Sequence, residues 1–284
     1  MSDRHGGKPR YTLSDLLELM AVLRDPQQGC PWDIKQDWHS IVPHTLEEAY
    51  EVADAIERHA FDELPGELGD LLFQVVYYSQ FGTEEQRFDF HDVVHVLTAK
   101  MLRRHPHVFP AGHLASRREG VSAHEVETSQ VNSRWESLKA AEREARPTPL
   151  EREPSVLDDI PHALPALSRA AKLSKRAARV GFDWPDSRGV IDKIREELAE
   201  VEEALARGDQ MHACDEVGDL LFAVANLARS LKADPEQCLR RTNAKFERRF
   251  RYVEDALAKQ GRTPAKASLD EMEAHWQSAK SHDN

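Results

Sequence analysis

The feature that most constrains the fold is an internal repeat, because the second half of the chain restates the first. The segment EEAYEV at 47–52 returns as EELAEV at 196–201, and ELGDLLF at 67–73 returns as EVGDLLF at 216–222. Both pairs of segments are 149 positions apart. Solenoid repeats are far shorter than this. The 284 residues are therefore expected to form a tandem duplication of one domain-sized unit.

Apolar residues recur every three or four positions in both halves, and no convincing strand-like alternation appears. This periodicity predicts helices over 13–23, 45–59, 67–81 and 92–104 in the first half, and over 163–180, 191–206, 214–232 and 236–259 in the second. The fold is therefore predicted to be all-α, with one four-helix unit in each half.

A polar stretch rich in Arg, Glu and Ser separates the two halves and closes with RPTPLEREP. We predict an N-terminal domain over 1–140, a linker over 141–155 and a C-terminal domain over 156–284. Trp135 lies in the segment SRWESLK, which resembles EAHWQSAK at 273–280. This tryptophan is expected to dock on the first domain.

The composition excludes several classes of protein. A net charge of -12 argues against a general nucleic-acid binder, which carries a positive surface. No stretch approaches 18 apolar residues, so no membrane span is expected, and the first residues lack the apolar core of a signal peptide. The three cysteines (Cys30, Cys214 and Cys238) form no C-x-x-C motif, which predicts free thiols in a reducing cytoplasm.

Each half places two acid pairs at i, i+3 on two of its predicted helices. Such spacing puts like charges on one face of a helix, where they repel and raise each other's pKa. A divalent cation would remove the repulsion, and Mg²⁺ commonly shares its ligands between carboxylates and substrate phosphates. A solvated acidic face is the alternative for one pair. Two pairs repeated at one offset favour a metal site formed by Glu48, Glu51, Glu67 and Asp70, and again by Glu197, Glu200, Glu216 and Asp219.

Glu48 alone has a simpler explanation, because Thr45 to Glu48 fits a helix capping box. The repeat tests that explanation. Glu197 is the counterpart of Glu48, and Ile194 stands where Thr45 would be, so it cannot cap. The acid is present where the cap is absent, and capping therefore does not explain it.

The residue types also indicate the metal. Di-iron helical proteins use Glu-x-x-His, whereas the i+3 partner is Glu or Asp in this chain. All-oxygen ligands favour Mg²⁺, with Mn²⁺ as a substitute. His91 and His95 have the spacing of two zinc ligands, but no third ligand is evident, so we expect surface histidines.

Two other features stand beside the acids. Gly69 and Gly218 lie inside predicted helices, where glycine costs ~1 kcal/mol relative to alanine. A close helix crossing or the close approach of a ligand would explain them, and the sequence leaves both open. A basic cluster also recurs, as KMLRRH at 100–105 and KFERRF at 245–250. It is either a solvated face or a phosphate-binding surface.

Together these motifs resemble the MazG family of nucleoside triphosphate pyrophosphohydrolases. The family pattern E-E-x-x-E followed by E-x-x-D occurs as Glu47-Glu48-x-x-Glu51 with Glu67-x-x-Asp70, and as Glu196-Glu197-x-x-Glu200 with Glu216-x-x-Asp219. The similarity extends over nearly the whole chain and includes GCPWD, RRHPHVF, LDDIPHALPAL and KFERRF. It is similar to the two-domain bacterial form.

The resemblance implies an all-α, Mg²⁺-dependent homodimer that hydrolyses (deoxy)nucleoside triphosphates, ATP among them, to the monophosphate and pyrophosphate. It implies catalysis by the C-terminal copy, in which Glu247 lies within the basic cluster. The implied catalytic residues are Glu196, Glu197 and Glu200, and the implied metal ligands are Glu197, Glu200, Glu216 and Asp219. The implied nucleotide contacts are Lys193, Lys245, Glu247, Arg248, Arg249 and Trp276. Because Glu48, Glu51, Glu67 and Asp70 are also present, a second working site stays open.

Two alternatives stay open beside this function. A related hydrolase could act on non-canonical nucleotides, and base-contacting residues that the sequence does not reveal would decide between the two. A duplicated helical module could instead serve dimerisation or regulation with little catalysis. Stabilisation by a nucleotide that requires Mg²⁺ would separate that module from an enzyme.

Overall fold

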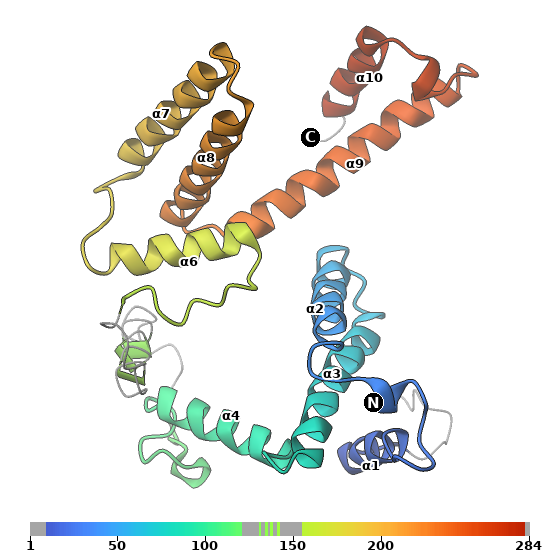
Figure 1. The fold of residues 1–284 in the computed structure, drawn as a ribbon, viewed down its shortest axis with the longest axis vertical. Coiled ribbons are helices and arrows are strands. Elements are labelled where there is room, and N and C mark those ends of the chain that lie inside the picture. Colours follow the sequence, from blue (N-terminus) through green and yellow to red (C-terminus); the bar gives the residue numbers. More distant parts are fainter. Residues whose placement is uncertain are drawn as a thin grey trace. The chain divides into compact units, whose positions relative to one another are not determined.

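The computed structural model describes residues 10–120, 131, 134–135, 137–138, 141–142 and 155–281. Throughout this part of the chain the regular structure is helical, so the predicted all-α duplication is confirmed (Figure 1). The chain divides into two compact units, Met1–Pro147 and Thr148–Asn284. None of the described helices is both long and apolar enough to cross a lipid bilayer.

The first unit is built around a pair of long helices. It contains α1 (Leu13–Leu23), η1 (Asp33–Lys35), α2 (Val42–Glu57), α3 (Leu64–Glu84), α4 (Phe90–Arg104) and η2 (Leu114–Ser116). Helices α1, α2 and α4 all pack on α3, and α2 makes the most extensive of these contacts. Capping boxes begin α1 at Thr12 and α4 at Asp89, because each side chain accepts from the backbone N–H three residues on.

The core of the first unit lies where α1 and the loop before α2 meet the second half of α3. Its buried members are Met20, Ile41, Val76, Tyr77, Phe81 and Phe90. Trp38 adds a ring that stacks on Tyr78, with ring centroids 5.9 Å apart. The apolar residues of α3 are thus buried mainly at one end of the α2–α3 pair.

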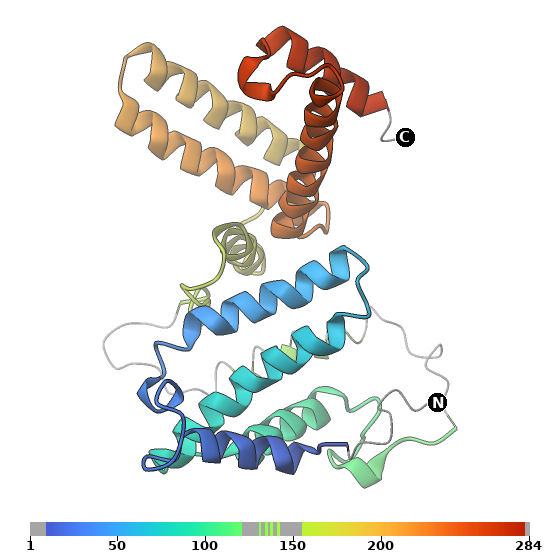
Figure 2. The same ribbon diagram turned by 90° about the vertical axis from the view of Figure 1, so that its right-hand side faces the viewer.

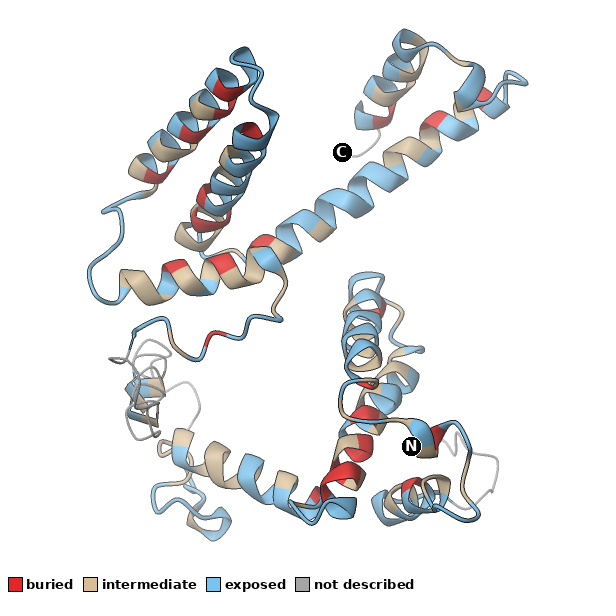
Figure 3. Ribbon diagram, viewed as in Figure 1, coloured by how far each residue is buried: buried red, intermediate tan, exposed pale blue. Residues whose placement is uncertain are grey.

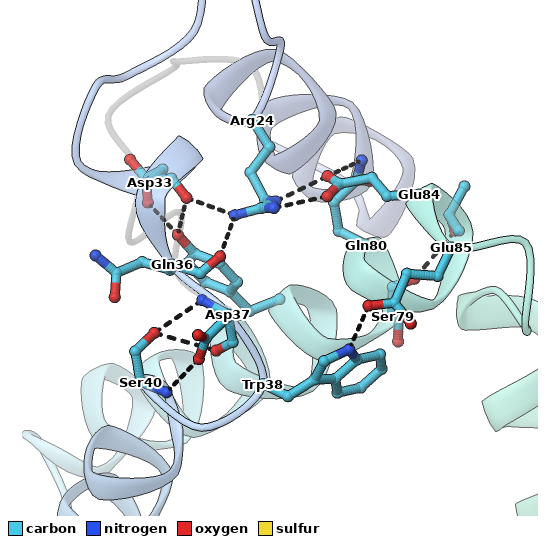
Figure 4. A network of polar contacts seen from close by, with 12 residues as sticks. Arg24, Asp33, Gln36, Asp37, Trp38, Ser40, Ser79, Gln80, Glu84 and Glu85 are labelled. Carbon is cyan, nitrogen blue, oxygen red and sulfur yellow. Dashed lines mark hydrogen bonds and ion pairs between the residues drawn. The ribbon is translucent and has the colours of Figure 1, made fainter.

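A polar network ties the loop of residues 24–40 to this core (Figure 4). Arg24, directly after α1, donates to both carboxylate oxygens of Glu84 on α3, at 2.8 and 2.6 Å, and to the backbone oxygens of Asp33 and Gln36. The Tyr77 hydroxyl donates to Oδ1 of the buried Asp33 at 2.8 Å. The conformation of the GCPWD segment is therefore fixed by side chains distant in sequence.

The second unit repeats the helix pair and adds an arm. It contains α6 (Ala166–Ala178), α7 (Ser187–Ala206), α8 (Gln210–Ser230), α9 (Pro235–Ala258), η4 (Pro264–Lys266) and α10 (Leu269–Ser281). Helices α7 and α8 form a long hairpin, and α6 packs on α8. Helix α9 contacts α6 and α8, then runs away from the α7–α8 hairpin, and α10 folds back on it (Figures 1 and 2).

Figure 3 shows exposed positions in pale blue along both helix hairpins. Large apolar side chains are among these exposed residues. On the α2–α3 hairpin these are Val42, Leu46, Tyr50, Ile56, Leu68, Leu72 and Val75. On the α7–α8 hairpin they include Leu198, Leu205, Val217, Leu221, Phe222 and Val224. We call the second set the α7–α8 apolar face. Exposed apolar side chains that gather into a large patch mark interaction sites in soluble proteins.

Candidate active site

The carboxylates of the second copy converge between α7 and α8. One oxygen from each of Glu197, Glu216 and Asp219 lies within 4.8 Å of the other two. Glu216 and Asp219 share a face of α8 because they are three residues apart, and the packing of α7 on α8 brings Glu197 to them. Oxygen ligands at this separation suit a hard divalent cation.

Glu200 completes this set from the next turn of α7. Desolvation raises the pKa of the Glu200 carboxyl, and its hydrogen bond to Glu197 and the nearby charge of Glu216 raise it further. The four acids that the spacing singled out are therefore neighbours in space. Their negative charges repel one another, and a bound cation would neutralise that repulsion.

Lys193 supplies a positive charge one turn before the acids. Its Nζ lies 2.7 Å from Oε1 of Glu196 and 2.7 Å from Oε1 of Glu197. Hydrogen bonding to Glu196, and then to Glu197, raises the pKa of Lys193 above its ordinary value. Glu197 is buried, so Lys193 compensates a carboxylate that water reaches poorly.

His212 also reaches this cluster, and sequence reasoning missed it. It lies one turn before Glu216 on α8, and its Nε2 is 3.4 Å from Oε1 of Glu216. The signal was an i, i+4 His–Glu spacing beside a predicted metal ligand. Such spacing is too common on helices to identify a site residue by itself.

The first copy forms a similar cluster between α2 and α3. One oxygen from each of Glu48, Glu67 and Asp70 lies within 4.8 Å of the other two. Burial raises the pKa of Glu48, as do the charges of Glu51 and Asp70 and a hydrogen bond with Glu51. All four predicted N-terminal acids are thus brought together.

The two clusters differ in their neighbouring cation. His44 stands in the first copy where Lys193 stands in the second, and its Nδ1 is 3.7 Å from Oε2 of Glu47. Its ring forms an edge-to-face pair with the exposed Trp32, with centroids 6.1 Å apart. Lysine is a fixed cation at neutral pH and histidine is not. The C-terminal cluster is therefore the better compensated one.

The capping explanation for Glu48 fails in the structure as well as in the repeat. Helix α2 begins at Val42, with a proline in its first turn, so Thr45 lies inside the helix. The Thr45 hydroxyl contacts the backbone oxygen of Ile41 at 3.1 Å and the hydroxyl of Tyr78 at 2.8 Å. The Thr45 hydroxyl therefore joins α2 to α3 and does not cap a helix.

A close helix crossing does not explain Gly69 and Gly218. A Cβ added to either residue would meet nothing within 4 Å, and both residues are exposed. Each stands directly before a clustered aspartate, Asp70 or Asp219. Of the two explanations that the sequence left open, approach by a group from outside the unit is the one that still fits. His91 and His95 are exposed, as expected.

The C-terminal basic cluster lies on the α9–α10 arm. The Trp276 ring on α10 packs against Phe246, with centroids 5.0 Å apart, and the Arg249 guanidinium lies 5.8 Å from the Trp276 ring centroid. Glu247 instead faces Arg251, with Oε2 at 3.5 Å. Part of the predicted nucleotide-contact set is therefore gathered on one arm.

The acid cluster and this basic arm lie apart within the second unit. Lys245, Arg248 and Arg249 lie in the middle of α9, beyond the point where this helix parts from the α7–α8 hairpin (Figures 1 and 2). The structure brings Lys193 to the acids and Trp276 to Arg249. It does not join these two groups into one pocket.

The N-terminal counterparts of the basic cluster are held by residues of the polar stretch. Glu142 accepts hydrogen bonds from Arg103 and Arg104 at the end of α4. Trp135 donates from Nε1 to the backbone oxygen of Arg104 at 2.7 Å, and its ring meets His105 edge to face. The predicted docking of Trp135 on the first domain is confirmed.

Comparison with known families identifies relatives that share these acid motifs. The MazG nucleotide pyrophosphohydrolase domain matches residues 36–109 and 187–253, and each matched segment contains one set of four acids. A nucleoside triphosphate pyrophosphohydrolase of Escherichia coli K12 is 48% identical over 267 residues, which cover 93% of this chain and 95% of that protein. The chain belongs to the MazG family. The resemblance inferred from the motifs is thereby confirmed.

Other MazG relatives are more distant. A nucleoside triphosphate pyrophosphohydrolase/pyrophosphatase of Thermotoga maritima is 37% identical over 269 residues, covering 95% of this chain and 96% of its own. A nucleoside triphosphate pyrophosphohydrolase of Mycobacterium tuberculosis is 30% identical over 169 residues, covering 59% of this chain and 46% of its own. The first of these relatives, like that of Escherichia coli, matches both halves of the duplication.

Proposed function

We propose that this protein hydrolyses (deoxy)nucleoside triphosphates to the monophosphate and pyrophosphate, with Mg²⁺ held by Glu197, Glu200, Glu216 and Asp219. The observation that carries the proposal is the convergence of these carboxylates between α7 and α8, beside Lys193. The names of the Escherichia coli and Thermotoga maritima relatives support the same activity. ATP, as a nucleoside triphosphate, is a substrate that we expect this site to accept.

The carboxylates suit such a metal for a physical reason. Four acids share one small region, and the pKa of Glu200 is raised there by desolvation and by its acidic neighbours. An all-oxygen donor set favours Mg²⁺, with Mn²⁺ as a substitute. When bound, the ion supplies neutralising charge for the triphosphate and lowers the pKa of a water molecule.

The chain's own residues then have separate tasks. Glu196 stands next to the proposed ligand Glu197, and we assign to Glu196, Glu197 or Glu200 the role of accepting a proton from the attacking water. Lys193, already shared between two of these acids, is free to turn toward phosphate once a cation satisfies Glu197. Water adds to phosphorus at the α–β bond, and pyrophosphate leaves.

The α9–α10 arm supplies the remaining contacts in this proposal. Lys245, Arg248 and Arg249 stabilise the negative charge that develops on the leaving pyrophosphate. Trp276 offers a ring face for the base. Glu247 stays a predicted nucleotide contact, although its carboxylate faces Arg251 in the structure.

A homodimer completes the proposal. The side chains of the α7–α8 apolar face are exposed in the single chain, and the acids and the basic arm lie apart. A second copy packed on this face would bury it. A twofold arrangement is the commonest way for identical chains to do so.

We also assign the enzyme to the cytoplasm and the main catalysis to the C-terminal copy. Nucleoside triphosphates are made and used in that compartment, and the three cysteines are free thiols. The acids of the first copy are retained, and His44 replaces Lys193 beside them. We assign that copy little turnover.

The decisive experiment compares Glu200→Ala, Glu51→Ala and the double variant. Pyrophosphate release from several nucleoside triphosphates is measured with Mg²⁺ and with EDTA. We expect Glu200→Ala to lose at least a hundredfold in rate and Glu51→Ala to lose little, since metal-held charge supplies several kcal/mol to such transition states. Full activity in the double variant would refute the metal site. Loss in Glu51→Ala alone would move catalysis to the first copy.

A further inference from the structure

Arg103 and Arg104, at the end of α4, hold a carboxylate of their own chain. Nitrogen atoms of these two side chains donate to different oxygens of Glu142, and the Arg103 contact measures 3.4 Å. Glu142 lies 38 residues beyond Arg104, in the polar stretch. One anion thus bridges two guanidinium groups, which is how paired arginines commonly bind an oxyanion.

The guanidinium of Arg104 is not fully satisfied by this contact. Its Nε is buried and has no acceptor among the residues that the structure describes. A buried donor without an acceptor is costly, and a carboxylate has only two oxygens to offer. Phosphate and pyrophosphate present more oxygens in a compact group. Phosphate is therefore a second kind of anion that suits this pair.

The internal repeat points to the same ligand. Arg103 and Arg104 in KMLRRH correspond to Arg248 and Arg249 in KFERRF. Trp135 and Trp276 stand in the two similar segments SRWESLK and EAHWQSAK. Trp276 lies against Arg249, whereas Trp135 bonds to the backbone of Arg104 and thereby anchors the stretch that carries Glu142.

We propose that Arg103 and Arg104 form an anion site for phosphate or pyrophosphate groups, and that Glu142 is its built-in competitor. The inference rests on the proposed function only through the matching of the two basic clusters. Glu142 keeps the N-terminal copy from holding the phosphates of a nucleotide. Its side chain is about one-third exposed, so the contact is weak enough for a phosphate ligand to displace it.

The test uses the full-length protein labelled with 5-fluorotryptophan. Trp135 is the local reporter, since it bonds to Arg104, and its fluorine signal is assigned with Trp135→Phe. Pyrophosphate is titrated in EDTA, so that neither the acidic clusters nor turnover contributes. In the unaltered chain we expect a Trp135 shift at millimolar pyrophosphate.

Glu142→Gln is expected to lower the pyrophosphate midpoint of that shift about three- to tenfold, which corresponds to the loss of one weak ion-pair competitor. Adding Arg104→Gln to this variant should abolish the shift. Glu18→Gln removes the same charge from an exposed site of the same unit and should leave the midpoint unchanged.

Three results would overturn the proposal: a Trp135 signal that pyrophosphate does not move in Glu142→Gln, an equal midpoint in Glu142→Gln and the unaltered chain, or a shift that survives Arg104→Gln. Each result is read without metal and without hydrolysis. Failure of the proposed function would instead appear as missing pyrophosphate release in the Mg²⁺ assay. The two failures are therefore distinguishable.

Discussion

Lys193 and Glu197 lie one turn apart on α7, with Nζ of the lysine 2.7 Å from Oε1 of the buried glutamate. The lysine also contacts Glu196, so one ammonium group compensates two adjacent carboxylates. The first copy has no equivalent, because His44 stands at this position. This ion pair therefore partly neutralises the C-terminal acid cluster when no metal ion is bound.

Lys193→Met is therefore expected to lower the free energy of unfolding of the metal-free protein by about 1–2 kcal/mol, because Glu197 is left buried without its partner. Saturating Mg²⁺ should recover most of this loss, since the ion takes over the compensation of charge. Thermal unfolding in EDTA and in Mg²⁺ measures both effects.

Arg195→Met is the matched control for this substitution. Arg195 pairs with Asp192 at 2.8 Å on the same helix, but both side chains are exposed, so little stability should be lost. Equal melting of Lys193→Met and the unaltered protein in EDTA would show that the lysine does not compensate Glu197.

The acid cluster itself opposes folding when no metal is bound. Glu200→Gln removes one of its charges, and the pKa of Glu200 is already raised by desolvation and by Glu197 and Glu216. We expect the substituted protein to melt higher than the unaltered protein in EDTA at neutral pH. It should also gain less from Mg²⁺. An unaltered Mg²⁺ response, measured by thermal unfolding, would remove Glu200 from the ligand set.

Much of this site could be predicted from the sequence, for physical reasons that are particular to it. The i, i+3 spacing fixes which acids share a helix face, and the repeat showed that capping does not explain Glu48, because its counterpart Glu197 has no cap. The helix pairs followed from apolar periodicity. Thr45 was misplaced as a candidate cap because the proline in the first turn of α2 starts that helix earlier.

Other features depend on tertiary contacts that periodicity does not encode. Nothing in the sequence links Arg24 to Glu84, which lie 60 residues apart, or Arg104 to Glu142. Periodicity also says which face of α9 is apolar without naming the helix that covers it. The sequence therefore did not predict that α9 runs away from the α7–α8 hairpin.

Arg24 and Glu84 make the stability of the first unit sensitive to acid (Figure 4). Burial alone would raise the pKa of Glu84, but hydrogen bonds from Arg24 and Gln80 outweigh it and hold the pKa below its ordinary value of 4.5. A lowered folded-state pKa contributes stability above the ordinary value, and that stability is lost as pH falls through the folded value.

Glu84→Gln should therefore lower the melting temperature at pH 7, by an amount corresponding to about 1–2 kcal/mol for a partly buried charged hydrogen bond. The difference from the unaltered protein should shrink as pH falls below 4.5. Thermal unfolding between pH 3 and pH 7 (roughly the range of carboxylate titration) tests this, with the exposed Glu18→Gln as control. A constant difference across that range would contradict the assignment.

The glycines before the clustered aspartates give the last prediction. A Cβ at Gly69 or Gly218 would meet nothing within 4 Å, so alanine should stabilise either helix by about 0.5–1 kcal/mol. Gly82→Ala is the contrasting variant on α3, since its Cβ would lie 2.6 Å from the backbone oxygen of Phe88 and should destabilise the unit.

Activity then separates the remaining explanations of these glycines. If a nucleotide or a second copy approaches Gly218, then Gly218→Ala should melt higher and yet release pyrophosphate more slowly. Gly69→Ala should gain the same stability without that loss, because the proposed catalysis lies in the second copy. Melting curves and pyrophosphate release, measured on the same preparations, decide the matter. A Gly218→Ala protein that is both more stable and fully active would show that nothing approaches this glycine during turnover.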